Sequence, residues 1–440
     1  MRQYPNYKTS RVEWLGEIPR DWSTIKIKYT DTLIMGQSPE SKDVTDFEKG
    51  LPFLQGNAEF TDTHPIPKNW CEKANKIAVK NDLLLSVRAP VGALNISDQT
   101  YGIGRGLCAI RANKNNLRFL YYLLSISKEE LNKVSTGTTF VAITIPNLSN
   151  LIIPKVLLPE QNSIVRFLDH KTGQIDRFIA NRKKQIELVK EQKISIINYA
   201  ITRGLNKDAT LKKSDTLTLD IYPENWKLSK LKYLLKKKRA AIRTGPFGTQ
   251  LKNSDLKEAG EIKIYNQRSV IDKNFTNGDE YISLEKFETL KEFVVNPNDF
   301  LITTRGTIGK CAIFPDNMKL GVLHPCLIRM QLDERIILNE YAMICLENAL
   351  YFQEEIKLLS NSTVIEVIYS YNLKEVFLPT PPIKEQKEIL SYVKSETSNI
   401  DSLITKYQKQ IDLMQEYRTS LISQAVTGKI DVRDWKPKKV

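Results

Sequence analysis

The pattern of hydrophobic and polar positions divides the chain into short apolar runs and two long stretches of helical periodicity. The short runs are of the β type and are separated by Gly, Pro and Asn. They read LPFLQGN, DLLLSVR and GLCAIRA in the first half, and EIKIYNQ, DFLITTR and HPCLIRMQL in the second. One helix is predicted after each set, over NNLRFLYYLLSISKEELNKVS and NEYAMICLENALYFQEEIKLLS. The pattern therefore predicts two α/β (mixed α+β) modules of roughly 150 residues each.

The two long stretches carry apolar residues at alternating spacings of four and three, which is typical of a coiled coil. Two seams follow this spacing: Ile175, Ile179, Arg182, Ile186, Val189, Lys193 and Ile196, and then Ile400, Ile404, Tyr407, Ile411, Met414, Arg418 and Leu421. One alternative is an ordinary amphipathic helix packed on its own module. We favour pairing of the two helices because their seams lack other apolar cover. The module between them in the chain predicts an antiparallel pair, and the interruptions at Lys193 and Arg418 are expected to help set its register.

The two halves of the chain are copies of one plan. IPRDWSTIKIKY (18–29) matches YPENWKLSKLKY (222–233) at an offset of 204, and DLLLSVRAPVG (82–92) matches DFLITTRGTIG (299–309) at 217. The offset is 225 for the stretch from 147 to 205, where 19 of 59 positions are identical. The second copy therefore carries its extra residues before its long helix. Divergent loops on a duplicated scaffold indicate two related sites with different specificities.

Charge gives the first indication of a partner. The 440 residues have a formal net charge of +14, which favours a polyanion, either nucleic acid or an anionic membrane surface. The sequence contains no run of eighteen apolar residues, no basic amphipathic helix and no lipid anchor or signal peptide. We therefore expect a soluble, cytoplasmic protein that binds nucleic acid rather than a membrane.

The motifs of a catalyst are missing from the sequence. Its three histidines and five scattered cysteines form no zinc-ligand spacing, and there is no phosphate-binding loop. YGIGRG (101–106) lacks the spacing of a dinucleotide-binding loop and precedes a predicted strand, so a turn is favoured there. No Asn-Pro-Pro-aromatic loop of a base methyltransferase occurs. The sequence predicts a reader of nucleic acid with no catalytic residues and no metal site.

The order of several motifs resembles the specificity (S) subunit of type I restriction–modification enzymes. These motifs are EWLGEIPRDW (13–22), STGTT (135–139), IPKVLLPEQNSIVRFLD (153–169) and the ending PPIKEQKEIL…AVTGKIDVRDW. The resemblance covers essentially the whole chain, although the second copy has SNSTV where the first has STGTT. It implies two target-recognition domains that alternate with two long helices in an internal pseudo-two-fold repeat, with boundaries that we place at 1–155, 156–205, 206–380 and 381–440.

The same resemblance implies a non-catalytic subunit of a DNA methyltransferase and restriction complex. Each recognition domain would read one half of a bipartite target in double-stranded DNA, and the helices would set the spacer. Two methyltransferase (M) subunits would dock on the helical regions, and restriction (R) subunits would join the complex. The resemblance implies no cofactor on this chain, and places S-adenosylmethionine, ATP and Mg on the partner subunits.

Candidate DNA contacts are polar and aromatic residues on the predicted loops. In the first copy they are Gln37, Ser38, Lys42, Asn57, Arg88, Arg105, Thr138 and Thr139. In the second copy they are Arg243, Lys252, Gln267, Arg268, Arg305, Ser362, Tyr369 and Tyr371. Arg88 and Arg305 recur at a strand end, so a structural role in the turn is an equal alternative. For the whole chain, the alternatives are an autonomous nucleic-acid-modifying enzyme and a non-specific coiled-coil scaffold.

Overall fold

A computed structural model describes residues 2–133, 142–278, 280–359 and 367–437. The chain forms two compact units. Unit 1 comprises residues 1–183 and 407–440, and unit 2 comprises residues 184–406. Each unit therefore contains one α/β module together with a part of each long helix.

The first module is built on two sheets that enclose an apolar core. A four-stranded antiparallel sheet has the order β10 (Leu94–Ile96), β9 (Leu83–Ser86), β12 (Leu107–Ala112) and β4 (Asp31–Met35). A five-stranded sheet has the order β5 (Val44–Thr45), β7 (Asn69–Cys71), β6 (Leu51–Leu54), β11 (Tyr101–Ile103) and β8 (Ile77–Ala78), with β6 and β11 parallel. Buried Leu54, Leu84, Tyr101 and Leu107 pack together from both sheets.

The second module repeats this topology. Its four-stranded antiparallel sheet has the order β17 (Ile242–Thr244), β23 (Leu327–Met330), β20 (Phe300–Thr303) and β21 (Cys311–Ile313). Its other sheet has the order β19 (Tyr281–Ile282), β18 (Ile262–Tyr265) and β22 (Gly321–Leu323), and β18 runs parallel to β22 as β6 does to β11. The helices α5 (Gln267–Ile271) and α6 (Leu284–Leu290) belong to the longer stretch of the second copy. The four-stranded sheet and the parallel strand pair thus recur in both modules, which confirms the predicted duplication, whereas the second sheets differ in their number of strands.

The two buried faces of strand β20 explain why its sequence is a continuous apolar run. Successive side chains of a strand point to opposite faces. Phe300 and Ile302 pack in the cluster that contains the helices, whereas Leu301 packs in the cluster shared with the other sheet. A strand that is buried on both faces has no solvent side and needs no polar alternation.

Small paired elements complete both modules. β1 (Tyr7–Thr9) pairs with β2 (Glu17–Pro19), and β14 (Leu211–Lys213) pairs with β15 (Ile221–Pro223). β3 (Ser23–Lys26) pairs with β13 (Ile152–Lys155), and β16 (Lys227–Lys230) pairs with β24 (Phe377–Thr380). The short helices are α3 (Ile145–Ser149) and α9 (Ser370–Glu375), and the 3-10 turns are Ile27–Tyr29, Ser41–Asp43, Leu231–Tyr233, Gly248–Gln250, Asn253–Asp255 and Lys291–Phe293.

The single helix predicted in each module is wrong, because each stretch forms two helices. The first stretch gives α1 (Leu117–Ile126) and α2 (Lys128–Lys133), and the second gives α7 (Asn339–Asn348) and α8 (Leu350–Leu359). The hydroxyl of buried Ser127 donates to the carbonyl of Leu123, a local bond that competes with helix continuation. In the second copy Ala349 leaves the helical region, with φ −70° and ψ 122°. Apolar periodicity continues across both breaks, so it did not reveal them.

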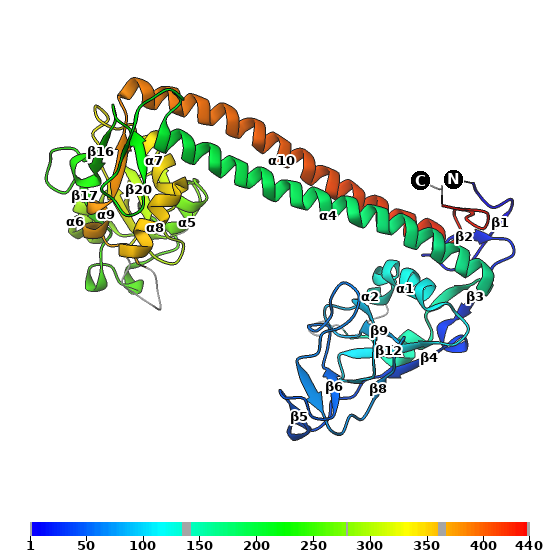
Figure 1. Ribbon diagram of the computed structural model, residues 1–440. Helices are drawn as coiled ribbons and strands as arrows, with labels where there is room; N and C mark the ends of the chain where they lie inside the picture. Colours follow the sequence, from blue (N-terminus) through cyan, green and yellow to red (C-terminus); the bar gives the residue numbers. More distant parts are fainter. Residues whose placement is uncertain (1, 134–141, 279, 360–366, 438–440) are drawn as a thin grey trace. The chain divides into compact units, whose positions relative to one another are not determined.

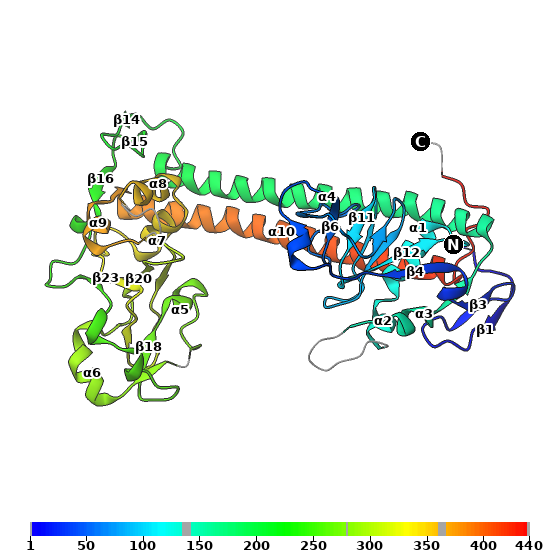
Figure 2. The ribbon, with the colours of Figure 1, turned by 90° about the horizontal axis from the view of Figure 1, so that it is seen from below.

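The long helices are α4 (Leu158–Arg203) and α10 (Ile383–Val426), and within each unit they lie side by side (Figures 1 and 2). All fourteen predicted seam positions are buried or partly buried. In unit 1 the guanidinium of Arg418 donates to Asp176 at 2.8 Å, and in unit 2 the ammonium of Lys193 contacts Asp401 at 2.7 Å. Asp401 lies 225 residues after Asp176, and Arg418 lies 225 residues after Lys193. The two pairs are therefore the same contact in the two copies, and both require antiparallel helices.

A buried glutamine joins each module to its long helix. Gln161 Oε1 accepts from the backbone N–H of Asn116 at 2.7 Å, and Gln386 Oε1 accepts from that of Leu338 at 2.8 Å. Each amide group also donates to a backbone carbonyl just before the long helix, that of Val156 or Pro381. The Glu-Gln motif therefore contributes a structural residue, which fixes α1 to the start of α4 and α7 to the start of α10.

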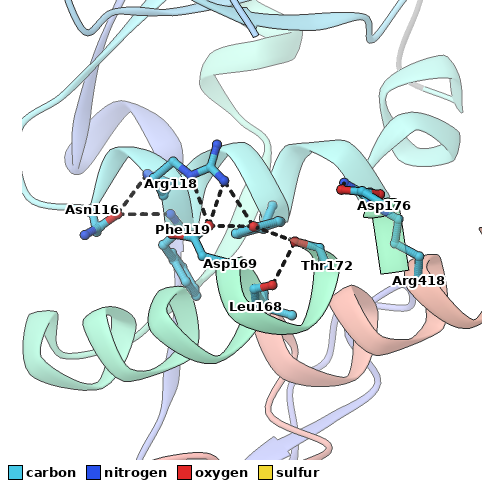
Figure 3. Close-up of polar contacts among 9 residues, drawn as sticks. Asn116, Arg118, Phe119, Leu168, Asp169, Thr172, Asp176 and Arg418 are labelled. Carbon is cyan, nitrogen blue, oxygen red and sulfur yellow. Dashed lines mark hydrogen bonds and ion pairs between the residues drawn. The ribbon is translucent and has the colours of Figure 1, made fainter. Parts of the chain in front are cut away.

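Unit 1 adds a polar cluster at this junction. Figure 3 shows Arg118 of α1 facing Asp169 of α4, with Asp176 and Arg418 on the helix pair. Arg118 Nη2 lies 2.7 Å from Asp169 Oδ1, and the hydroxyl of Tyr122 donates to the same oxygen at 2.6 Å. Burial, together with this bond, raises the pKa of Tyr122 to about 12. The cluster fixes the orientation of α1 on the long helix.

Candidate nucleic-acid interface

Four segments of the first module converge at one end of its two sheets. The backbone N–H of Gln37 donates to Ile103 O at 3.0 Å, and the side-chain amide of Gln55 donates to Ser38 Oγ at 3.0 Å. Gly106 N–H donates to Gln55 O at 3.2 Å. These bonds bring together the segments 35–42, 55–60 and 101–106, which carry predicted contacts of the first copy. Exposed Gln37 and Arg105 and half-buried Ser38 thus belong to one surface, which we call loop cluster 1.

Arg88 joins the same cluster through its backbone. Val87 N–H donates to Gly106 O at 2.9 Å, and Ile143 N–H donates to Val87 O at 2.8 Å. Arg88 itself forms a β-bridge with Ala142, while its side chain is exposed. The backbone at Arg88 therefore takes part in the turn, and its side chain lies at the surface. Thr138 and Thr139 lie outside the described residues.

Loop cluster 2, in the second module, is built by matching hydrogen bonds. Gly245 N–H donates to Leu327 O at 2.9 Å, just as Gly36 N–H donates to Leu107 O at 2.8 Å. The bond from His324 N–H to Tyr265 O corresponds to the bond from Gly104 N–H to Leu54 O. Two further bonds, Thr304 N–H to Cys326 O and Ile368 N–H to Thr304 O, match those of Val87 and Ile143. Arg305 forms a β-bridge with Val367, as Arg88 does with Ala142.

The side chains on this shared frame differ between the clusters. Arg105 of cluster 1 lies between Gly104 and Gly106, whereas Pro325 of cluster 2 lies between His324 and Cys326. The guanidinium of Arg305 lies 5.0 Å from the ring centroid of Phe247, a cation–π contact. The Gln267 side chain donates to Thr307 O at 3.4 Å and thereby belongs to cluster 2. Gln55 and Phe247 lie in predicted loops but were not selected as contacts, and His324 was missed because only the fold brings it to the cluster.

His324 is a neutral group at the base of cluster 2. Burial and the nearby charge of Arg305 outweigh Glu280 and lower the pKa of His324 below its usual value. Its Nδ1 accepts a hydrogen bond from the backbone N–H of Cys326 at 3.2 Å, which places the ring proton on Nε2. The imidazole is therefore a structural acceptor in the turn at neutral pH.

Some predicted contacts have acidic partners within the chain. Arg243 Nη1 lies 2.5 Å from Glu292 Oε2 and its guanidinium lies over the ring of Phe293. Lys42 pairs with Glu40 at 2.6 Å, and Arg268 pairs with Asp272 at 3.3 Å. Exposed pairs such as the last two contribute at most about 1 kcal/mol and exchange readily for another anion. Arg243 is more enclosed, so a phosphate would have to displace Glu292.

The remaining candidates lie on the surface. Tyr369 and Tyr371 are exposed, and their rings stack with centroids 5.3 Å apart and planes 9° apart. Asn57 is half-buried, and Lys252 is exposed with its backbone N–H donating to Asp255. Ser362 lies outside the described residues. The stacked pair follows directly after Ile368, whose backbone N–H donates to Thr304 of cluster 2.

Within the described ranges, no group of three or more His, Cys, Asp and Glu residues is arranged to hold a metal ion. Among these residues, no helix is both long and apolar enough to cross a membrane. Two copies of one loop frame, each with different polar side chains, define a two-module recognition protein.

Comparison with known proteins identifies the family. The family model of the type I restriction modification DNA specificity domain matches residues 19–188 and again residues 223–413. The chain belongs to this family. It is a specificity subunit of a type I restriction–modification system, and it is non-catalytic, since the catalytic activities lie on partner subunits.

Named relatives agree with this assignment. The EcoBI specificity subunit of Escherichia coli is 22% identical over 433 residues, covering 95% of this chain and 88% of the relative. The MjaIX specificity subunit of Methanocaldococcus jannaschii is 24% identical over 462 residues, covering 96% of each. The MjaX subunit of the same organism is 37% identical over 201 residues, and this match spans 46% of its length.

Solved structures show the same fold. A chain from a study of complex assembly and conformational transition of the type I R-M system has a TM-score of 0.70 and 15% identity, covering 94% of this chain and 99% of that one. The HsdS subunit from Thermoanaerobacter tengcongensis has a TM-score of 0.51 and 15% identity, covering 94% and 98%.

Proposed function

We propose that each recognition module, residues 1–155 and 206–380, reads one half of a bipartite DNA target through its loop cluster. The observation that carries this proposal is the shared frame with unlike side chains. Matching hydrogen bonds hold both clusters in one geometry, whereas the residues they present, such as Arg105 and Pro325, differ. Two equivalent surfaces with different polar groups suit two different short sequences on one duplex.

Within each cluster we assign base contacts to the exposed side chains and phosphate contacts to the surrounding cations. Arg105 and Gln37 are the leading base readers of cluster 1, because arginine and glutamine recognise base edges through paired hydrogen bonds. Arg88 and Lys42 would bind phosphates. In cluster 2, Arg305 would contact DNA while it rests on Phe247. The net charge of +14 supplies the sequence-independent part of binding.

We assign the spacer to the paired long helices. Lys193–Asp401 and Arg418–Asp176 are repeat-related cross-helix contacts that fix the register of the antiparallel pair. The helix pair would thereby set the number of base pairs between the two half-sites.

The outer faces of the long helices support the docking of two identical partner subunits. On α4, Lys184, Leu188, Glu191 and Ser195 are exposed, and the identical residues Lys409, Leu413, Glu416 and Ser420 are exposed on α10. Their spacing of four, three and four places each set on one helix face. Leu188 and Leu413 are 53% and 50% exposed, so burial in a fold core does not explain why both copies have leucine. A partner present twice, such as the methyltransferase subunit, would use the same face twice.

In this assembly the cofactors remain on the partners. S-adenosylmethionine would be bound by the two methyltransferase subunits, and ATP and Mg by the restriction subunits. The chain would carry out its work in the cytoplasm, where these partners and the DNA are present.

The decisive experiment is coexpression with the methyltransferase subunit, followed by sequencing that maps methylated adenines. We expect one bipartite motif. Exchange of residues 35–145 for those of another family member should change one half of the motif and leave the other half intact. Arg105→Ala should relax one position of the same half, whereas Arg166→Ala, an exposed arginine on α4, should change nothing.

The docking assignment has its own test. The double variant Leu188→Asp, Leu413→Asp should lose copurification with the methyltransferase subunit, whereas Leu217→Asp, at an exposed leucine outside the helices, should retain it. Methylation by the purified chain alone would instead support an autonomous enzyme. A complex whose methylation shows no motif would support a non-specific scaffold.

A further inference from the structure

Unit 1 contains a filled aromatic site at the start of α4. Tyr4 is buried, and its hydroxyl donates to Glu160 Oε1 at 2.6 Å. Its ring meets Trp22 edge-on with centroids 5.8 Å apart, and the guanidinium of Arg433 lies 4.9 Å from its centroid. The backbone of Arg2 accepts from Asp431 N–H at 2.9 Å, which holds this N-terminal segment in place. The segment thus brings a tyrosine to a carboxylate and a tryptophan.

Unit 2 repeats the carboxylate and the tryptophan but has no matching tyrosine. Glu385 corresponds to Glu160 at the offset of 225, and Trp226 corresponds to Trp22 at 204. The residue that corresponds to Tyr4 is Asp208, which is exposed. Gly204 and Gly428 end the two long helices with φ of 72° and 74°, and each packs against the tryptophan of its own unit. Glu385 therefore takes the place of Glu160 in unit 2 without a tyrosine beside it, whereas Trp226, 2% exposed, is already covered by its own unit.

An open cavity of about 680 Å³ lies beside Glu385 in unit 2, and Trp226 is not part of its lining. Its lining includes Glu385, Asn225 and Ala209, together with Glu224, Glu388 and Lys384. Three carboxylates against one ammonium make the wall acidic. The volume lies within the roughly 300–1,000 Å³ that is usual for ligand pockets. Asn225 Nδ2 approaches Glu385 Oε2 only at 3.5 Å, which leaves Glu385 well placed to accept a shorter bond.

We propose that this cavity, the Glu385 cavity, binds a tyrosine side chain from a basic segment of another protein chain. The filled site shows the chemistry, because Tyr4 is accompanied by Arg2 in its segment and lies under Arg433. The acidic wall of the cavity favours the same positive charge. A second copy of this chain is not the source, because its own segment is already buried against Glu160. The proposal does not rest on DNA recognition.

The test uses the full chain and a fluorescent peptide with the sequence RQYPNY, residues 2–7. We expect saturable binding at one peptide per chain. A peptide with phenylalanine in place of the first tyrosine should bind at least about tenfold more weakly, because it loses a hydrogen bond to a charged acceptor. Equal binding of the two peptides would refute the role of the carboxylate.

Three variants of the chain locate the site. Glu385→Gln should weaken binding about tenfold, since it replaces a charged acceptor with a neutral one. Ala209→Trp should abolish binding by filling the cavity, and Glu396→Gln, on the same helix outside the lining, should bind as the unaltered chain does. Peptide binding that survives Glu385→Gln and Ala209→Trp but changes in Glu160→Gln would place the peptide in unit 1 and overturn the proposal.

Discussion

The two loop clusters share a backbone and differ in their side chains. Four matched hydrogen bonds hold cluster 1 and cluster 2 in the same frame, although the chain between those bonds differs in length. Gly104 and Gly106 of one correspond to His324 and Cys326 of the other. The duplication has therefore preserved the means of positioning loops and changed what the loops present. This division suits the two unlike half-sites that we propose for the modules.

The glycines at the strand ends offer the strongest test of the shared frame. A Cβ at Gly36 would overlap the carbonyl oxygen of Gly104, and a Cβ at Gly245 would overlap that of His324. Neither obstacle is a side-chain end that could move aside. We expect Gly36→Ala and Gly245→Ala each to lower the free energy of unfolding by about 3 kcal/mol or more. Denaturant titration measures this, and Gly56→Ala, where a Cβ has open space, is the control.

If Gly36→Ala and Gly245→Ala lowered the free energy of unfolding by very different amounts, the two loop frames would not be equivalent in energy. A large loss for Gly36→Ala beside a negligible one for Gly245→Ala would mean that cluster 2 adapts where cluster 1 does not. Methylation mapping would then show whether that half of the target tolerates substitution.

Substitution of the buried glutamines is expected to cause the next largest loss of stability. Gln161→Leu and Gln386→Leu keep the approximate volume but leave a backbone N–H and a carbonyl of each junction without their partner. Unsatisfied buried groups cost about 1–3 kcal/mol each, so we expect each variant to lose about 2–4 kcal/mol. Thermal unfolding compares the two variants directly. Near-neutral results would show that water replaces the side chain at the junction.

Sequence reasoning succeeded where the pattern is local and failed where it depends on tertiary contacts. The seams from Ile175 and from Ile400 follow from spacing alone, and all their positions are at least partly buried. The helix breaks at Ser127 and Ala349 could not be predicted from spacing, because apolar periodicity runs through both. The role of Gln161 was hidden as well, since its partner Asn116 is 45 residues away.

The candidate site likewise has features that the sequence predicted and features that it could not predict. The loops around Gln37, Arg105 and Arg305 were predicted, because turns between buried strands must lie at the surface. Their grouping into clusters could not be, because it depends on strand order. Arg243 illustrates the limit: its sequence neighbourhood gives no sign of Glu292, which lies 49 residues further along the chain.

A carboxyl group distinguishes the two modules in their response to pH. Glu355 on α8 is half-buried, one of its oxygens has no hydrogen-bond partner among the described residues, and burial raises its pKa to about 7. Its counterpart Glu130 on α2 instead pairs with Lys133 at 2.7 Å. Because the folded state of Glu355 holds its proton more tightly than the unfolded state, its contribution to stability falls as the pH rises from about 4.5 to about 7.

We expect Glu355→Gln to remove this loss. Its melting temperature relative to the unaltered chain should rise between pH 5 and pH 8, by the equivalent of about 1–2 kcal/mol after allowance for solvent screening. Glu130→Gln should show no such relative gain, because its carboxylate is stabilised by the lysine. A parallel pH profile for Glu355→Gln and the unaltered chain would place the Glu355 carboxyl in contact with water.

The smallest expected effect tests the helix pair. Asp176→Lys places two cations together in unit 1, and Asp401→Lys does so in unit 2. Because these contacts are partly exposed, each variant should lose about 0.5–1 kcal/mol, and more at low salt. The reversed pairs Asp176→Lys with Arg418→Asp, and Asp401→Lys with Lys193→Asp, should restore most of the loss. Equal coupling energies from the two double-mutant cycles would establish that the repeat-related contacts are equivalent in energy as well as in geometry. A coupling in one unit only would mean that one ion pair sets the register for the whole helix pair.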